Sequence, residues 1–572
     1  MNAYRTVESW IRQWSTPENA QPLDPAGSTG ACVTLRLNGR VIGRVVAMEG
    51  DGECVWRAAR AALAEADANA PVENDALRSD RMRDIARRVT IDLQIAGTLT
   101  PLLGDTTGAA VASLDPGRHG VAARVAGAIA AVFPGTQLSM NWLPQQGMEA
   151  AIAELRLPPV RLSELRERHG LVIYSFEACH LAQITPEAAP IFLHRGGAII
   201  PRSDVSEQGL RRFADRLAAH LLTHAWPRTE DKPLSMGLTG DYAPLLDRYD
   251  PLVASPLDQG IACFALSRYA GCPGAHAETA GAAADLARRI VRELVIVEDG
   301  EADPLADAPS AAAFVIAHSA LRRLPARADN PSSEPATDAF AASALQRVRT
   351  DISGKAGSGR VLTPAEKALC VYALACAARH NTDEKSPLAA EAERALRALL
   401  RETSFGDVAS LMPWAGWAEL DLSGDGEIPS ELMLRQFRDE TWRHQLSDAD
   451  TGVRGADFAG GIVFTRTEAG LPSLPTWSSL RPVAFLATML GDHRLTDNDE
   501  MLAEASRLQL AFRFAMQLSI DRSAMHMFRD AERSIGGVRP ALWEQRAALG
   551  PTSLALLATC ELLEASSRHA GR

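Results

Sequence analysis

The sequence predicts two unlike parts, an α+β module over residues 1–203 followed by an all-α array of helical hairpins over residues 204–572. Its length of 572 residues exceeds what one hydrophobic core usually serves. Short segments before residue 200 alternate apolar and polar side chains, which is typical of strands. After residue 203 helical spacing dominates. With 46% hydrophobic and 23% charged residues, the chain can build sizeable cores.

A β-hairpin is expected near the start of the first part. Residues 32–37 alternate apolar and polar, Asn38-Gly39 follows, and a second apolar run covers residues 41–46. Asn-Gly between two such runs is the strongest short-range hairpin signal. Apolar residues at helical spacing over 56–63 then predict a helix that covers one face of the hairpin. Strand alternation returns over residues 89–95 and 172–176, so the module is predicted to be α+β.

Five segments of the first part suggest a family. They are ACVTLRLNGRVIG from Ala31, VTIDLQIAGTLTPL from Val89, DPGRHGV with FPGTQL, MEAAIAELRLPP, and LVIYSFEACHL. Their order resembles the AMMECR-type domain, named after the AMME chromosomal region, over about one third of the chain. The family signature Leu-Arg-Gly-Cys-Ile-Gly follows the hairpin turn and corresponds here to residues 41–46. Only Gly43 matches, and Arg44 stands at the cysteine position, so any activity that the family owes to this cysteine is not expected.

A recurring type of helix characterises residues 204–572. Each example opens with a small or helix-starting residue and continues as an Ala- and Leu-rich helix that is apolar nearly all round, so it must be buried on most sides. More charged, amphipathic helices lie between these at intervals of about 50 to 70 residues, a spacing typical of helix-hairpin repeats. Thr363 and Glu366 form a capping box at one start. The buried helices are expected to begin near Ser255, Ala308, Thr363, Ser478 and Gly550.

Such an array is either an open solenoid or a closed ring. In an open solenoid, one side of each inner helix usually faces a wet groove. The buried helices predicted here are apolar nearly all round, so closure is favoured. The pattern resembles the α/α-toroids of six-hairpin glycosidases, sugar epimerases and terpenoid cyclases, as a resemblance of architecture alone. Residues 324–338, rich in Pro, Ser and Ala, are expected to form an exposed loop within the array.

Composition and missing motifs exclude several classes of function. The net charge of -12 argues against a nucleic-acid partner. Neither a secretory signal nor an apolar run of membrane-spanning length is evident, so a cytoplasmic protein without a membrane partner is expected. Nucleotide-binding glycine loops, serine-hydrolase elbows and zinc signatures are also missing, so no cofactor is predicted. Cysteines on the buried helices are expected to be buried and unpaired: Cys263, Cys370, Cys376 and Cys560.

If the inner helices are parallel, their N-termini gather at one end and make it a natural ligand mouth. Three loops that lead into inner helices, residues 239–259, 471–482 and 536–553, are rich in Asp, Arg, Trp and Tyr. Carboxylates beside aromatic rings suit acid-base chemistry on sugars. The alternative is that these residues cap helices, pack or form ion pairs. The candidates are Asp250 and Asp258 for catalysis, and Trp477, Arg481, Arg539 and Trp543 for binding, with an anionic sugar as the expected ligand.

Two possible metal sites are weighed against structural roles. Asp421, Ser423 and Asp425 imitate the start of a calcium loop, but Leu432 occupies the twelfth position, where a bidentate carboxylate is required. A tight turn between helices is therefore predicted there, with no metal. The histidines at 169, 180 and 194 match no metal-ligand spacing and are predicted to be structural.

Two hypotheses on function follow. The first is an enzyme, glycosidase-, lyase- or epimerase-like, in which the toroid acts on a carbohydrate or polyol through acid-base carboxylates. The second is a non-catalytic binding or scaffold protein, in which the AMMECR-like module and the toroid together hold a protein partner.

Overall fold

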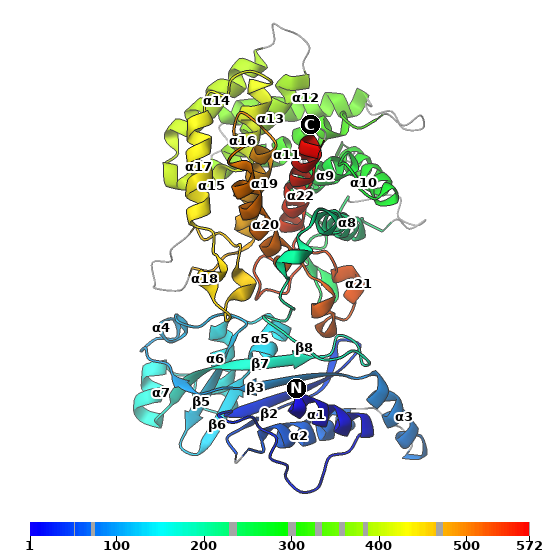
Figure 1. The fold of residues 1–572 in the computed structure, drawn as a ribbon, viewed down its shortest axis with the longest axis vertical. Helices are drawn as coiled ribbons and strands as arrows, with labels where there is room; N and C mark the ends of the chain where they lie inside the picture. The colour runs from blue at the N-terminus through cyan, green and yellow to red at the C-terminus, as the bar shows by residue number, and fades with distance from the viewer. Residues whose placement is uncertain are drawn as a thin grey trace.

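In the computed structural model the chain forms a sheet-containing part followed by a helical part, which lie one below the other in Figure 1. The structure describes residues 1–50, 52–69, 75–227, 237–295, 305–325, 335–353, 361–380, 387–464 and 473–570. No helix within these ranges is both long and apolar enough to cross a membrane.

The first part contains an antiparallel sheet with the strand order β2-β1-β3-β7-β5-β6. The outermost strands β2 and β6 also contact each other, so the sheet curves into a barrel-like form. Two short strands, β4 (Thr100–Pro101) and β8 (Ile191–Phe192), pair with β7. The main strands are β1 (Gly30–Leu37), β2 (Arg40–Met48), β3 (Thr90–Ala96), β5 (His119–Val125), β6 (Ala128–Val132) and β7 (Val172–Ala182).

The hairpin predicted at Asn38-Gly39 is confirmed, because β1 pairs with β2 and both turn residues have positive φ. This turn also contacts the helical part: a Cβ atom on Gly39 would lie 2.0 Å from the carbonyl oxygen of Phe528. The predicted helix after the hairpin is α2 (Cys54–Asn69).

The two faces of the curved sheet differ in chemistry. The outer face of β1 and β3 carries Val33, Leu35, Ile91 and Leu93, which pack against α1 and α2. The inner face carries polar side chains that are nevertheless buried, among them Thr34, Arg36, Asp92, Gln94 and His180. The remaining helices of this part are α1 (Asn2–Gln13), α3 (Asp75–Arg88), α4 (Thr107–Val111), α5 (Pro134–Met140), α6 (Pro144–Glu154) and α7 (Leu162–His169).

The second part is a helical array that begins with α8 (Glu207–Thr223), whose N-cap residue Ser206 accepts a hydrogen bond from the Gly209 N–H. The last strand of the large sheet ends at Phe192 and is followed by a single bridge between His194 and Gly197, and the helical part contains one short strand pair, β9 (Tyr242–Ala243) with β10 (Arg248–Tyr249). The domain boundary at residue 203 stays a prediction.

Among the described helices of the array, one group is buried on most sides, and we call its members the inner helices. In α11 every residue is buried, and the cysteines predicted to be buried and unpaired are so. The inner helices are α9 (Pro256–Ala270), α11 (Ala308–Leu321), α13 (Pro364–His380), α16 (Trp414–Ser423), α19 (Leu480–Leu490) and α22 (Leu549–Ala570). Between them lie α10 (Ala277–Val295), α12 (Pro335–Ile352), α14 (Leu388–Glu402), α17 (Glu431–Arg443) and α20 (Met501–Leu518).

The inner helices are neighbours in sequence order. α9 packs against α11, α11 against α13, and α13 against α16. α16 meets α19 where the Trp417 Nε1–H donates to Thr488 Oγ1 at 2.8 Å. α19 packs against α22, and α22 packs against α9. The first and last inner helices are therefore in contact, as Figure 1 shows for α9 and α22.

One sequence prediction about the array needs correction, and a second is confirmed only in part. The loop expected over residues 324–338 is helical at its end, because α12 begins at Pro335, whose fixed φ suits the first turn of a helix. Leu324 is buried, and residues 326–334 lie outside the described part of the chain. The calcium-loop-like segment is also helical at its start, since Asp421 and Ser423 belong to the last turn of α16.

Candidate functional site

A charged cavity of about 560 Å³ lies at the C-terminal ends of the inner helices. Each inner helix, or the residues directly after it, contributes to its wall, so the inner helices run parallel. We call this space the charged cavity. Its lining residues are Arg268, Arg323, Tyr372, Arg379, Trp417, Leu420, Asp421, Gly424, Asp425, Thr488, Asp492, Arg494, Glu561, Glu564 and Arg568.

Two carboxylates of α22 share one arginine in this cavity. Arg268 Nη2 lies 2.5 Å from Glu561 Oε1 and 2.9 Å from Glu564 Oε1. Glu561 Oε2 also accepts a hydrogen bond of 3.0 Å from Thr488 Oγ1. Because Glu561 and Glu564 are three residues apart on a helix, they occupy the same face and point into the same space.

The environments of the cavity carboxylates differ. Burial raises the pKa of Glu564 above its usual value, although Arg268 opposes the shift. Burial alone would also raise the pKa of Asp492, but hydrogen bonds from the Arg494 side chain and backbone lower it below the usual value. Carboxyl groups whose pKa values are pushed apart are the usual basis of a division between acid and base roles.

Aromatic side chains form another part of the cavity wall. The buried rings of Tyr372 and Trp417 line the cavity, with their centroids 5.7 Å apart. Phe264 and Trp414 pack behind them. A ring beside carboxylates and guanidinium groups gives a ligand both an apolar surface and polar partners.

The predicted catalytic residues Asp250 and Asp258 lie at the other, N-terminal end of the inner helices. Asp258 and Ser255 form a capping arrangement at the start of α9, in which Ser255 Oγ accepts from the Asp258 N–H at 3.1 Å. Asp250 has a side chain that is 70% exposed and lies 3.6 Å from the Arg248 guanidinium. Burial raises the pKa of a third carboxylate, Asp241, and the negative charges of Asp258 and Asp250 add to this shift.

The loops of the first and last hairpins do meet at this end. Asp241 accepts a hydrogen bond of 2.9 Å from the N–H of Leu549, the first residue of α22. The backbones of Tyr242 and Ala547 exchange hydrogen bonds of 2.9 Å. The first N–H group of α22 is thus already satisfied by a protein partner.

Trp477 and Arg481 form a pair at the start of α19. The Arg481 guanidinium lies over the Trp477 ring at 5.1 Å from its centroid. The Trp477 N–H donates to the carbonyl of Pro540 at 2.9 Å, which connects this loop to the segment before α22. Burial lowers the pKa of Arg481 below its usual value.

Arg539 is held inside the protein, and Trp543 is partly buried. Arg539 is buried, and its guanidinium donates to the carbonyl groups of Gln517, Leu518 and Leu542 at 2.7 to 3.1 Å. Trp543 packs against Phe458, with ring centroids 6.5 Å apart. The contacts of Arg539 are those of a structural arginine, whereas the sequence suggested a residue at the rim of a ligand mouth.

Asp421 of the calcium-loop-like segment lines the charged cavity. Its carboxylate oxygens face two arginines, with Arg379 at 2.5 Å and Arg323 at 3.8 Å. The Gly424 backbone has φ +52°, which ends α16 and starts the predicted turn. The carboxylate therefore takes part in ion pairs within the cavity wall.

The comparisons with known proteins provide little further guidance. No protein-family model and no curated protein matches the chain. Among solved structures, the chain is similar to the uncharacterized protein PH0010 from Pyrococcus horikoshii, over 33% of this chain and 92% of that one. The sequence identity is 13% and the TM-score 0.24, and at that score the likeness supports no conclusion about fold or function.

Sequence reasoning missed the carboxylates of the charged cavity. Glu561 and Glu564 interrupt the apolar sequence LALLATCELLEA near the end of the last helix. An acidic residue on the face of a helix that is otherwise apolar all round was the available signal, because such a residue needs a buried partner. Arg268, at the corresponding place near the end of α9, gives the same signal.

Proposed function

We propose that the charged cavity binds a small polyhydroxylated molecule, a sugar or polyol, and that the protein is an enzyme that acts on it by acid-base catalysis. The observation that carries the proposal is the meeting of Glu561, Glu564 and Arg268 in one cavity with an aromatic wall. Carboxylates beside rings are the groups that sugar chemistry requires.

We also infer that the inner helices close into an α/α-toroid. In support, each inner helix contacts the next and α22 returns to α9. In further support, every inner helix contributes to the wall of one cavity, which is what a ring with a central hollow produces.

The position of the cavity decides what kind of ligand suits it. The C-terminal ends of helices carry partial negative charge, so this end attracts hydrogen-bond donors, whereas the opposite end attracts anions. Arginines and carboxylates share the wall. Hydroxyl groups donate to carboxylates and accept from guanidinium groups, so a neutral sugar or polyol fits better than the anionic sugar expected from the sequence.

The carboxylates suit two different roles. Glu564, whose pKa is raised by burial, is the general acid that protonates a leaving oxygen. Glu561, bound by Arg268 and Thr488, is the carboxylate that acts as base or nucleophile. Both contact the same nitrogen of Arg268, so their separation is closer to the roughly 5 Å of retaining glycosidases than to the roughly 6.5–9.5 Å of inverting ones.

The first part has a supporting role in this proposal. We infer that it has the AMMECR-type fold, on the order of its hairpin, strands and helices. Arg44, at the position of the family's cysteine, donates to Ser139 Oγ at 2.8 Å. An arginine held in this way supplies no nucleophile, so the chemistry is assigned to the helical part.

The second candidate is a binding or scaffold protein, and one observation favours it. The cavity charges already pair with each other, as Asp421 does with Arg379 and Arg323. In that case the network stabilises the array, and the cavity performs no chemistry.

The test is a thermal-shift screen of the full chain against neutral sugars, polyols, sugar acids and sugar phosphates, followed by turnover assays with each ligand that stabilises it. A ligand that binds the folded state raises the melting temperature. The matched variants are Glu564→Gln, in the cavity, and Glu440→Gln, on the exposed face of α17. We expect Glu564→Gln to keep ligand binding and to lose at least about 100-fold in turnover, the usual contribution of a general acid, and Glu440→Gln to change neither.

Two other results would contradict parts of the proposal. Stabilisation by a ligand without turnover in the unmodified protein identifies a binding protein. If no sugar or polyol stabilises the chain, the ligand class is wrong.

A further inference from the structure

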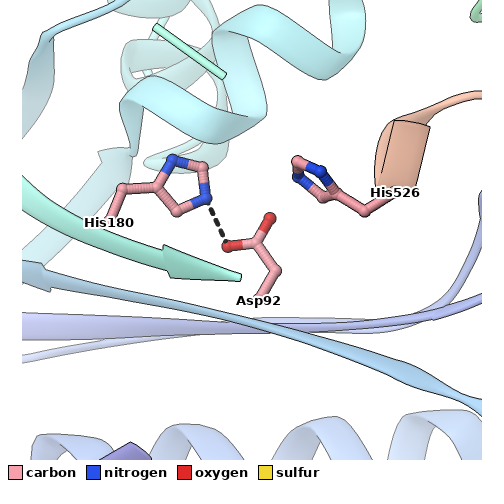
Figure 2. A group of neighbouring side chains, drawn as sticks. All are labelled: Asp92, His180 and His526. Atoms are coloured by element: carbon pink, nitrogen blue, oxygen red, sulfur yellow. Dashed lines mark ion pairs between the residues drawn. The ribbon is translucent and has the colours of Figure 1, made fainter. Parts of the chain in front are cut away.

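Away from the charged cavity, a buried cluster joins the two parts of the chain. Asp92 lies on β3 and His180 on β7, and His526 lies on the 3-10 helix η5 (Arg522–Met527) of the helical part. Figure 2 shows the three side chains pointing toward one another. All three are buried, and one ligand atom from each lies within 4.8 Å of the others.

Hydrogen bonding fixes the orientation of His526. Its Nδ1 lies 3.1 Å from the carbonyl oxygen of Ser523, which can only accept, so Nδ1 carries the proton. The other nitrogen, Nε2, is then an unprotonated lone pair. Ser523 is itself held to the first part, because its Oγ accepts from the N–H of Ala198 at 2.8 Å.

Three atoms in this cluster are buried without a hydrogen-bond partner among the described residues: Asp92 Oδ1, His180 Nε2 and His526 Nε2. Asp92 Oδ1 and His180 Nε2 lie 2.8 Å apart as an ion pair, drawn as the dashed line in Figure 2, but not in hydrogen-bond geometry. A buried polar atom without a partner costs about 1–3 kcal/mol, and His526 Nε2 has none although it lies beside the Asp92–His180 pair, which indicates that something else binds between them.

We propose that Asp92, His180 and His526 bind a divalent first-row transition-metal ion that ties the sheet to the helical array. Two imidazoles and one carboxylate are a ligand set that suits zinc and ferrous iron. Metal–ligand bonds are about 2.0–2.2 Å long, so two ligand atoms on one ion lie at most about 4.4 Å apart. The ligand atoms here lie within 4.8 Å of one another, so the widest separation shortens slightly when the ion binds.

Neighbouring groups support the ligands and set the proton balance. Arg36 Nη2 lies 3.8 Å from Asp92 Oδ2, the carboxylate oxygen that is not paired with His180. The positive charge of Arg36 weakens the binding of a cation but keeps the carboxylate oriented. His180 binds through Nε2 as a neutral imidazole, so any proton on that atom moves to Nδ1 or to solvent when the ion enters.

The experiment uses the full chain without a polyhistidine tag, unfolded and refolded either with a chelator or with Zn²⁺ or Co²⁺, because the cluster is buried between the parts. We expect one bound ion per chain by elemental analysis and visible absorption bands from Co²⁺ in a nitrogen- and oxygen-ligated site. Refolding with Zn²⁺ should also raise the melting temperature above that of the chelator-treated protein.

Matched histidine variants locate the site. His526→Ala should reduce metal affinity by more than the roughly 10–100-fold that loss of an outer-shell group costs, and His444→Ala, an exposed histidine on the same part, should leave it unchanged. If His526→Ala does not fold, the Co²⁺ spectrum of the unmodified chain and of His444→Ala decides the question. Refolded protein that holds no stoichiometric ion and shows no Co²⁺ bands would overturn the proposal, and the three atoms would then share buried water. This result is independent of the sugar screen, which concerns the charged cavity.

Discussion

His220 of α8 and His224, the residue that caps the C-terminus of this helix, have their Nε2 atoms 3.1 Å from each other, and both rings are buried. The Nδ1 of His224 donates to the carbonyl of Thr239 at 3.3 Å, so its Nε2 accepts a hydrogen bond from the Nε2–H of His220. Burial lowers the pKa of His224 to about 4 and the pKa of His220 well below its usual value, and His224 lowers the latter further.

This pair predicts loss of stability in acid. In the unfolded chain both imidazoles bind a proton near pH 6.5, whereas in the folded chain they remain neutral. The unfolded state therefore binds more protons as the pH falls from about 6.5 toward 4, and each imidazole lowers the free energy of unfolding by about 1.4 kcal/mol per pH unit in that window. Urea unfolding at four pH values checks this. His220→Gln should flatten the pH dependence, and an unchanged slope in that variant would contradict the assignment.

Arg195 is expected to contribute strongly to the contact between the two parts. It is buried between Asp115 of the first part and Asp457 of the helical part, and its guanidinium lies 4.0 Å from the centre of the Phe458 ring. Arg195→Ala leaves these carboxylates without their cation, so we expect a loss of about 3–5 kcal/mol in the free energy of unfolding. The control is Arg202→Ala, which removes an exposed pair with Asp448 and should cost less than about 1 kcal/mol. Equal losses in the two variants would show that the buried pair has no special role.

The segment that connects the parts should resist proteolysis. The N–H of Ala198 donates to Ser523 Oγ and the N–H of Ile200 donates to Gln517 Oε1, both at 2.8 Å. Proteases cut segments that open locally, and these bonds oppose opening. Limited trypsin digestion should therefore release a fragment ending between residues 195 and 212 only slowly. Rapid release of that fragment would indicate a weak contact and two independent domains.

Arg539→Ala is expected to destabilise the fold. Removing the guanidinium leaves three buried carbonyl groups without their donor, and each unsatisfied group costs about 1–3 kcal/mol. Burial also lowers the pKa of Arg539 to about 10, which still leaves the group charged at neutral pH. Thermal melting and urea unfolding measure the loss. A variant as stable as the unmodified protein would restore Arg539 as a ligand-binding candidate.

Gly416 tests the contact between the inner helices α16 and α19. A Cβ atom there would lie 2.4 Å from the Phe485 ring, so Gly416→Ala must displace a buried aromatic side chain. Overpacking of this kind costs about 1–3 kcal/mol. Gly406→Ala is the control, because a Cβ atom at that position meets nothing within 4 Å. The difference in free energy of unfolding between the variants is the measurement, and no difference would mean that α16 and α19 are not tightly packed.

The sequence predicted features that depend on neighbouring residues. Asn38-Gly39 specifies its own turn, and Thr363 with Glu366 forms the predicted capping box, with the Thr363 N–H donating to Glu366 at 2.8 Å. The inner helices that are apolar on all sides were also predicted, because the composition of each segment alone indicates that it is buried. The inner helix α16 was missed because it is short and its Pro413 and Gly424 ends resemble those of a loop.

Features that depend on distant partners could not be predicted. Arg539 looks like a surface arginine in a polar loop, since two of its carbonyl partners come from the end of α20. Asp92 follows the polar positions of a strand, a pattern typical of a solvent-facing side chain, yet it is buried where β7 and the helical part meet the sheet. The position of the charged cavity follows from the parallel order of the inner helices, which no single helix specifies.

The hairpin turn at Gly39 also limits which sheet-containing parts from related proteins could replace the first part of this chain. A solvent-exposed turn of this kind accepts residues that tolerate positive φ, such as Asn or Asp in place of Gly. Here a side chain at position 39 meets the backbone at Phe528. A related module carrying Asn or Asp at that position would form its own hairpin and still fail to dock. The parts of this protein are therefore not interchangeable units, and recombination between relatives is tolerated only where the turn and residues 528–529 are inherited together.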